Sequence, residues 1–210
     1  MNNSNTQHII RDQWNQWAES WYLRYRTDEA IAKIINDPAS AFHPVTYALI
    51  REAFPSLQGK RVCVPSSGDN HAVYAFHLLG AQVTSCDISE KQIASSAAIA
   101  SKHGWEIEFL VEDTMRLGSV ADEAYDLVYT SNGVHVWIHD LKAMYRNVRR
   151  ILKDGGSSIM FDILLGRRIG RKCKSAVAGR ARRLLRLEVQ PAGGIAAVVV
   201  GAVGEEPLIH

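Results

Sequence analysis

The sequence predicts an α/β fold, in which a mostly parallel sheet is flanked by helices and preceded by a helical cap at the N-terminus. From residue 60 onward, short apolar runs alternate with helical stretches of about 8–15 residues, which is the pattern of βαβ units. Before residue 55, the apolar residues recur at helical spacing instead. The hydrophobic content of 47% and the charged content of 22% are typical of a chain that buries a core. We therefore expect a cap at 1–58, a core at 59–163 and a separate tail at 164–210.

The cap is expected to hold three helices. Thr27 is placed as the N-cap of the second helix, and Pro44 lies in the first turn of the third. The first helix is predicted by four aromatic residues at spacings of three and four, which lie along one stripe of a helix. These residues are Trp14, Trp17, Trp21 and Tyr25. The stripe either packs against the core or covers a substrate, and for the second alternative the candidate lid residues are Trp17, Tyr22 and Tyr25.

The core is expected to contain five strands separated by helices. Ser89 is suited to cap the helix after the second strand, and Gly104 is suited to end it. The predicted strands lie at 61–64, 82–86, 107–111, 125–130 and 157–163. The predicted helices lie at 72–79, 89–103 and 141–152.

Small and polar residues follow the predicted strands, where parallel α/β sheets bind their ligands. The run at 66–70 enters a helix, so a ligand can approach its backbone and the helix N-terminus. Asp87 lies 19 residues beyond Gly68 and can accept hydrogen bonds from both hydroxyls of a ribose. Asp113 and Met115 follow the third strand, where they can hold and cover an adenine. Each acid taken singly is more often a helix cap or a solvated strand end. The candidate ligand-binding residues are Ser66, Ser67, Gly68, Asp69, Asp87, Ile88, Asp113, Thr114, Met115, Ser131 and Asn132.

Five runs of the core and one of the cap carry a family resemblance. The runs are VCVPSSGDNH at 62–71, TSCDIS at 84–89, FLVED at 109–113, YDLVY at 125–129, NVRRILKDGG at 147–156 and WNQWAESWY at 14–22. Together they resemble the class I methyltransferases that depend on S-adenosylmethionine (SAM). The resemblance implies a Rossmann-like fold, SAM as the cofactor, and transfer of a methyl group to an unidentified acceptor, which we expect to be a small molecule.

The chain departs from the family in the loop after the first strand. That loop commonly carries an acid and three glycines, whereas here Val64 stands in place of the acid and Ser66 and Asn70 in place of two glycines. Gly68 remains. Asp69 is the candidate to replace the missing acid near the amino group of the cofactor.

The resemblance also implies a mechanism that needs little covalent chemistry from the protein. The enzyme aligns a nucleophile behind an activated methyl group and excludes water, in some cases with a general base. His135 follows the fourth strand and is the candidate base, with a packing or capping role as the alternative. No metal site is expected, because Cys63, Cys86 and Cys173 are far apart in the sequence.

The tail differs in composition from the rest of the chain. Residues 1–163 hold 15 Lys and Arg against 19 Asp and Glu, whereas residues 164–210 hold 9 against 3 and contain no aromatic residue. One interpretation is a basic segment that contacts phosphates of nucleic acid or an acidic membrane. The other, which we favour, is a shift of the reading frame near residue 163. In that case the tail does not supply the helix and the antiparallel hairpin that close the sheet in this family.

The remaining expectations concern partners and location. We do not expect nucleic acid as the acceptor, because residues 1–163 carry a net charge of −4 (15 − 19) and TSNG at 130–133 stands where enzymes that methylate DNA amino groups have an Asn-Pro-Pro-Tyr type motif. The N-terminus lacks the apolar run of a signal peptide, so a cytoplasmic monomer or homodimer without membrane contact is expected. Two alternatives stay open: a SAM-fold binding protein without catalysis, and a nucleic-acid methyltransferase that uses the basic tail.

Overall fold

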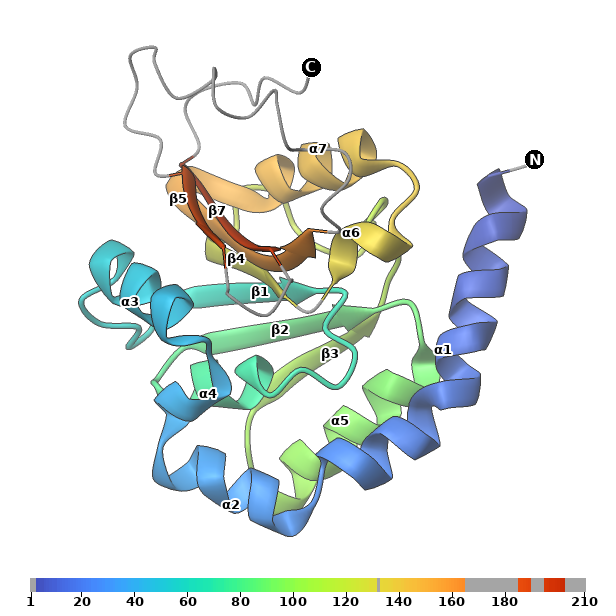
Figure 1. The fold of residues 1–210 in the computed structure, drawn as a ribbon, viewed down its shortest axis with the longest axis horizontal. Coiled ribbons are helices and arrows are strands. Elements are labelled where there is room, and N and C mark those ends of the chain that lie inside the picture. Colours follow the sequence, from blue (N-terminus) through green and yellow to red (C-terminus); the bar gives the residue numbers. More distant parts are fainter. Residues whose placement is uncertain (1–2, 132, 165–184, 190–194, 203–210) are drawn as a thin grey trace.

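The computed structural model describes residues 3–131, 133–164, 185–189 and 195–202, and these residues form a seven-stranded sheet with the order β3-β2-β1-β4-β5-β7-β6 (Figure 1). The first five strands are parallel, and β7 runs antiparallel to both of its neighbours. The strands are β1 (Arg61–Pro65), β2 (Gln82–Asp87), β3 (Ile107–Val111), β4 (Tyr125–Ser131), β5 (Leu152–Leu164), β6 (Leu185–Val189) and β7 (Ile195–Ala202). The mostly parallel α/β fold expected from the sequence is therefore confirmed.

Helices cover both faces of this sheet, and α1 runs beside α5 along one side of the molecule (Figure 1). Within the described stretches, no helix combines the length and the apolar content of a transmembrane span. The helices are α1 (Asn3–Tyr25), α2 (Asp28–Asn36), the 3-10 helix η1 (Pro38–Ala41), α3 (Pro44–Ala53), α4 (Ala72–Leu78), α5 (Glu90–His103), α6 (Val134–Trp137) and α7 (Leu141–Ile151). The short helices η1 and α6 were not predicted.

The predicted helix ends are confirmed by their hydrogen bonds. The Thr27 hydroxyl accepts a bond from the Ala30 amide, and the Ser89 hydroxyl accepts one from the Gln92 amide. Gly104 ends α5 with a φ of 68°, a left-handed conformation that glycine adopts without strain. These local signals fix where each helix starts and stops before any packing is considered.

Two apolar clusters lie on opposite faces of the sheet. Alternate residues of one strand belong to different clusters, because successive side chains of a strand point to opposite faces. On β1, Val62 joins the cluster that α2, α3 and α4 complete, whereas Cys63 joins the cluster completed by α7. On β4, Leu127 and Val128 divide in the same way. The central strands are thus buried on both faces, as is typical of parallel sheets.

Strand order reverses at β1, whose neighbours are β2 on one side and β4 on the other. After β1 the chain forms β2 and β3 on one side of β1, and it then crosses over to form β4 on the other side. The loops that follow these two strands therefore diverge and leave a crevice at their carboxyl ends. This arrangement places the polar loops described above around one site.

The tail contributes two strands, which corrects the expectation that it lacks the hairpin that closes the sheet. β7 pairs with β5 over eight residues, from Ser157 opposite Ala202 to Leu164 opposite Ile195, and β6 pairs with β7. The physical reason is that strand pairing needs backbone and β-branched residues, which 198–200 supply, and does not need aromatic residues. The basic segment at 166–183 lies outside the described residues, and the proposed frame shift stays a prediction.

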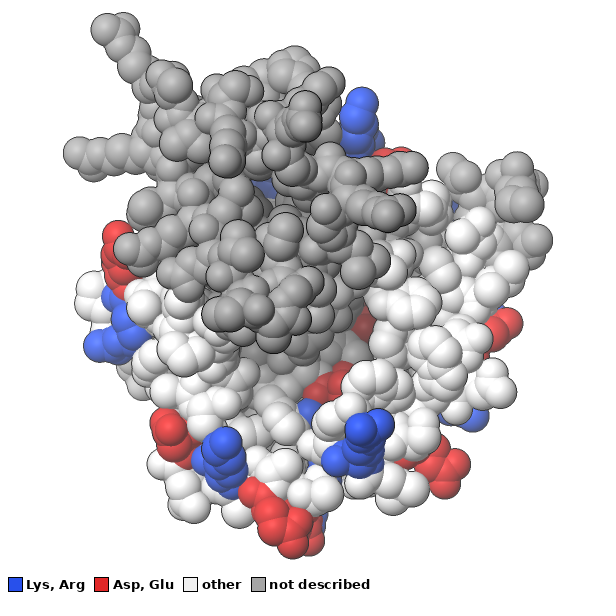
Figure 2. Space-filling model, viewed as in Figure 1, with Lys and Arg blue, Asp and Glu red and all other residues white. Residues whose placement is uncertain are grey.

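Charges of both signs are interspersed on the described surface. Figure 2 shows Lys and Arg side chains next to Asp and Glu around the margin of one face, with uncharged residues between them. Several of these charges are paired, as Lys102 is with Asp28 at 2.8 Å. On this face the described residues form no large patch of either positive or negative charge.

The buried position of Leu127 at the centre of the sheet gives a stability prediction. Its side chain is 0% exposed, so Leu127→Ala is expected to lower the free energy of unfolding by about 2–5 kcal/mol through lost burial and a residual cavity. The matched control is Leu23→Ala on α1, where the leucine is 69% exposed and the change should stay within about 0.5 kcal/mol. Urea unfolding followed by circular dichroism measures both, and equal losses would contradict the described sheet.

Candidate functional site

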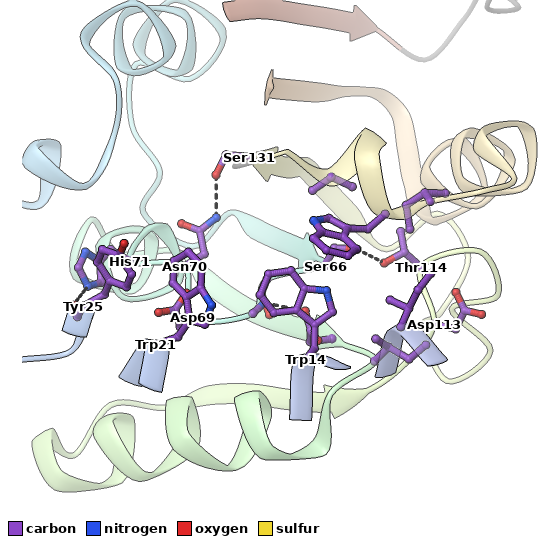
Figure 3. Close-up of a pocket in the computed structure, with 18 of the residues that line it drawn as sticks. Trp14, Trp21, Tyr25, Ser66, Asp69, Asn70, His71, Asp113, Thr114 and Ser131 are labelled. Atoms are coloured by element: carbon purple, nitrogen blue, oxygen red, sulfur yellow. Dashed lines mark hydrogen bonds between the residues drawn. The ribbon is translucent and has the colours of Figure 1, made fainter. Parts of the chain in front are cut away.

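A cavity of about 510 Å³ opens at the carboxyl ends of β1, β2 and β4, and α1 covers one side of it (Figure 3). Its wall contains all but two of the residues that the sequence singled out for ligand binding. The predicted residues in the wall are Ser66, Ser67, Gly68, Asp69, Asp87, Ile88, Asp113, Thr114 and Ser131. Of the other two, Met115 does not line the cavity and Asn132 lies outside the described residues.

The loop after β1 has the backbone shape of a glycine-rich turn although it holds a single glycine. Ser66 has a φ of 50° and Gly68 a φ of 49°, both in the left-handed region. A residue with a side chain is strained there and persists only where its surroundings hold it. The Ser66 hydroxyl lies 2.7 Å from that of Thr114, and the neighbouring Ser67 hydroxyl lies 2.8 Å from that of Ser85. Hydrogen bonds to other loops thus hold a turn that glycines form elsewhere without cost.

Asn70 provides a further link across the crevice. Its side-chain nitrogen donates to the Ser131 hydroxyl at 2.8 Å, which joins the loop after β1 to the end of β4 (Figure 3). Its side-chain oxygen accepts a bond from the Ala72 amide and so supports the start of α4. The second glycine substitution therefore also has a structural role in this chain.

Asp87 lies at the floor of the cavity with both carboxylate oxygens engaged. Oδ2 accepts a 2.7 Å hydrogen bond from the Gly68 amide, and Oδ1 accepts a 2.8 Å bond from the Ser89 amide. A Cβ on Gly68 would lie 3.8 Å from Oδ2, which is an ordinary van der Waals distance. The constraint on this position is therefore its left-handed φ of 49° and not a lack of space.

Burial raises the pKa of Asp87 to about 6, against the opposing effect of its backbone hydrogen bonds. The carboxylate is 7% exposed and is mostly ionised at neutral pH. Because the pKa is higher in the folded chain than in the unfolded chain, the ionised carboxylate lowers the stability of the fold at neutral pH. This loss disappears as the pH falls from about 6 toward 4. Such a group is retained for what it binds rather than for stability.

The loop after β3 is held from two sides. Thr114 contacts Ser66, as described above, and the Asn147 side chain of α7 donates a 2.6 Å hydrogen bond to the Met115 carbonyl. The Met115 sulfur lies 3.8 Å from the Gln7 amide nitrogen of α1. The loop is therefore fixed relative to both the sheet and the helix that covers the cavity.

Two specific contacts position α1 over the cavity. The Asn15 side-chain oxygen accepts a 2.6 Å hydrogen bond from the hydroxyl of Ser89, which follows Asp87 by two residues. At the other end of α1, His71 donates from Nε2 to the Tyr25 carbonyl at 2.9 Å, since a carbonyl oxygen can only accept. Burial lowers the pKa of His71 to about 4, so its imidazole is neutral at physiological pH.

A buried pair of opposite charges forms one end of the cavity wall. The Arg26 side chain is 2% exposed, and its Nη2 lies 3.6 Å from Oδ1 of Asp69. Burial lowers the pKa of Arg26, while the carboxylate of Asp69 and the ring of Tyr74 act in the opposite direction. Within the described part of the chain, Arg26 Nε and Nη2 and Asp69 Oδ2 make no hydrogen bond. Buried polar atoms are seldom left unbonded, so this pair is suited to bind a ligand that carries both a carboxylate and an ammonium group.

The candidate base His135 is not brought to the cavity. Its Nε2 lies 2.6 Å from the Tyr145 hydroxyl, and that hydroxyl lies 3.6 Å from the Met160 sulfur. His135 thus belongs to the contact between α6 and α7. The geometry favours the packing role that the sequence left as the alternative.

The aromatic stripe of α1 divides between the cavity and its surroundings. Of the predicted lid residues, Tyr25 lines the cavity, Tyr22 packs against the core, and Trp17 contacts Trp137 of α6 at 5.9 Å between ring centroids. Trp14 lines the cavity and lies 5.1 Å from the same Trp137 ring. Aromatic rings from α1 and α6 therefore meet above the polar floor.

Sequence reasoning did not identify several residues of the cavity wall. Arg26 was not predicted because it lies outside all the sequence motifs described above. Trp137 was not predicted because its helix, α6, was not. Among the described residues, no three His, Cys, Asp or Glu side chains converge as they do in a metal site. The wall residues not predicted for the site are Gln7, Ile10, Arg26, Ala41, Asn70, His71, Val134, Trp137 and Ile138.

Comparison with known proteins gives a family match for this region. A family model described as a methyltransferase domain matches residues 65–160, which include all the loops of the cavity floor. No curated protein matches the chain in sequence.

Among solved structures, the chain is similar to magnesium protoporphyrin IX methyltransferase from Synechocystis PCC 6803, with a TM-score of 0.65 and 17% identity over 95% of this chain and 97% of that chain. It is also similar to phosphoethanolamine N-methyltransferase 1 from Haemonchus contortus, with a TM-score of 0.58 and 18% identity over 77% and 33%. The YcgJ protein from Bacillus subtilis gives a TM-score of 0.52 and 20% identity over 58% and 51%, so the chain spans about half of its length. At these identities the likenesses establish the fold.

The charge pair in the cavity wall gives an asymmetric stability prediction. Asp69→Asn removes the counter-charge of a buried guanidinium and is expected to lower the free energy of unfolding by about 1–3 kcal/mol. Arg26→Met is expected to cost less, because the Asp69 side chain left behind is 23% exposed and water can reach it. Urea unfolding at neutral pH measures both variants. A larger loss for Arg26→Met than for Asp69→Asn would show that the pair is not the buried contact described here.

Proposed function

We propose that this chain, whose residues 65–160 match a family model described as a methyltransferase domain, is a class I methyltransferase that transfers a methyl group from SAM to a small-molecule acceptor. The observation that carries the proposal is the meeting of Gly68 and Asp87 at 2.7 Å in the wall of one cavity, at the point where strand order reverses. A carboxylate in this place after the second strand is the group that accepts hydrogen bonds from ribose hydroxyls.

The residues present are suited to the parts of the cofactor. Asp87 is suited to the ribose, and Asp113, which also lines the cavity, is suited to the adenine. Arg26 and Asp69 lie at the other end with unbonded polar atoms, and they are suited to the carboxylate and the ammonium group of the methionine part. Asp69 thereby takes the place of the acid that Val64 replaces in the loop. A volume of about 510 Å³ is in the range of pockets that bind ligands of this size.

When bound, SAM supplies a methyl group on a positively charged sulfur, and its transfer to a nucleophile leaves the neutral thioether S-adenosylhomocysteine. The chain's own contribution is alignment and the exclusion of water. The backbone of the β1 loop and the carboxylate of Asp87 fix the ligand against the sheet. Trp14, Trp21 and Tyr25 of α1 cover it with apolar and electron-rich ring surfaces, which tolerate a nearby positive charge.

A small molecule is favoured over nucleic acid as the acceptor by the surface around the site. α1 covers the cavity, so a reactive atom must enter beside this helix (Figure 3). On the face shown in Figure 2, the described residues intersperse both charges. Proteins that bind the phosphate backbone of nucleic acid present a basic patch or stripe. The described residues of this face do not form one.

Binding of S-adenosylhomocysteine tests the cofactor assignment directly. Calorimetric titration of the full chain is expected to give saturable binding of SAM and S-adenosylhomocysteine but not of NAD. Asp87→Ala should weaken this binding about 10- to 100-fold, because hydrogen bonds to a charged group contribute about 1.5–3 kcal/mol. Asp154→Ala, which removes an exposed aspartate outside the cavity, is the matched control and should leave the affinity unchanged. A folded chain that binds neither compound would disprove the proposed function.

The raised pKa of Asp87 also predicts how cofactor binding depends on pH. The ionised carboxylate accepts hydrogen bonds from both ribose hydroxyls, and its protonated form loses acceptor capacity. The affinity for S-adenosylhomocysteine should therefore be constant above pH 7 and fall by up to about tenfold per pH unit below about pH 6. Asp87→Asn should bind more weakly and show no such fall between pH 5 and 7. The same fall in wild type and in Asp87→Asn would assign the titration to another group.

A further inference from the structure

A second cavity lies against α1, next to the first. The described residues that line its volume of about 350 Å³ are Trp17, Ser20, Trp21, Arg24 and Tyr25. They follow one another at intervals of one, three or four along α1 and so form one face of that helix. Trp21 and Tyr25 line both cavities, so the two spaces border the same pair of rings.

This face offers flat aromatic surfaces and one positive charge. The rings of Trp21 and Tyr25 are stacked with centroids 4.7 Å apart and planes 28° apart. The Arg24 guanidinium carbon lies 5.3 Å from the centroid of the Tyr25 ring. The Ser20 hydroxyl is already bonded, since it donates to the Trp17 carbonyl at 2.9 Å. The described lining contains no carboxylate.

The two cavities present different polar groups, so we expect them to bind different kinds of ligand. The first cavity holds the carboxylate of Asp87 and the Arg26–Asp69 pair, which suit a nucleoside joined to an amino acid. The described lining of the second cavity holds no carboxylate that would accept hydrogen bonds from a ribose or pair with an ammonium group. Because both cavities border the rings of Trp21 and Tyr25, a ligand in the second cavity would lie next to one in the first.

We propose that the second cavity binds the methyl acceptor and that this acceptor is a flat aromatic small molecule with an anionic group. The aromatic part packs against the rings of Trp21 and Tyr25, where stacked or edge contacts add to the burial of apolar surface. The anionic group pairs with Arg24, whose guanidinium can bind a carboxylate through two hydrogen bonds. A cationic acceptor is disfavoured by Arg24 itself. The inference rests on the proposed function, because it assigns the acceptor of that reaction.

The test uses 2-naphthoate as the probe, titrated into the full chain by calorimetry with and without saturating S-adenosylhomocysteine. Two compounds of similar size separate the chemical classes: 2-naphthylmethylamine is flat and cationic, and decalin-2-carboxylate is anionic but not aromatic. With the cofactor product bound, 2-naphthoate is expected to bind at least about tenfold more tightly than either, because stacking and charge each contribute. Equal binding of all three compounds would overturn the assignment of a flat anion.

Two variants locate the probe, and both residues lie outside the first cavity. Trp17→Leu and Arg24→Gln should each weaken 2-naphthoate binding about three- to tenfold, and Arg24→Gln should remove its advantage over the cationic compound. Trp105→Leu and Arg51→Gln are the matched controls, since Trp105 lies in the loop between α5 and β3 and Arg51 lies on α3, and they should leave the probe unaffected. S-adenosylhomocysteine should bind Arg24→Gln and both control variants as it binds wild type. Circular dichroism confirms that each variant is folded.

The outcomes separate this inference from the proposed function. Binding of S-adenosylhomocysteine without binding of 2-naphthoate, or binding that neither α1 variant weakens, overturns the acceptor site and leaves the cofactor assignment standing. Failure of S-adenosylhomocysteine to bind the folded wild type overturns both, because an acceptor site requires a methyl donor.

Discussion

The two backbone hydrogen bonds to the buried carboxylate of Asp87 connect the parts of the molecule that form the cavity. Through the Gly68 amide, Asp87 fixes the turn after β1, and through the Ser89 amide it fixes the start of α5. Ser89 in turn donates to Asn15, so the position of α1 follows from that of the same carboxylate. One acidic group at the end of β2 therefore sets the floor, one wall and the cover of the site.

The buried charges of the site lower the stability of the fold. The site also accounts for the absence of a simple apolar stripe along α1. A helix that only packed on the sheet would present one apolar stripe and a polar remainder. α1 is instead followed directly by the buried Arg26, and it carries aromatic rings on the face that lines the second cavity. The burial of the Arg26 charge and the partial exposure of large rings both weaken folding. The composition of α1 therefore reflects the two cavities that it lines more than its packing on the sheet.

The sequence predicted what depends on local order and missed what depends on distant contacts. The positions of the first five strands, the caps at Thr27 and Ser89, and the place of Asp87 after β2 all follow from periodicity and chain order, and all were predicted. Arg26 enters the cavity only because α1 ends where α4 begins, which no local pattern encodes. β7 was missed for another reason. Its run of Ala, Gly and Val lies in a tail without aromatic residues, whereas its pairing with β5 uses backbone groups and the β-branched residues at 198–200.

The departures of this chain from the family's glycine-rich loop have a common physical basis. Glycine lowers the cost of a left-handed turn, but the same turn can be held by hydrogen bonds that outweigh the strain. Here Ser66 bonds to Thr114, and Asn70 bonds to Ser131, so each substitution ties the loop to a neighbouring strand end. Under the proposed function, Asp69, whose Oδ1 lies 3.6 Å from Arg26 Nη2, takes the place of the acid that Val64 replaces. The loop thus keeps its shape through hydrogen bonds to the rest of the fold, where other members of the family rely on glycines.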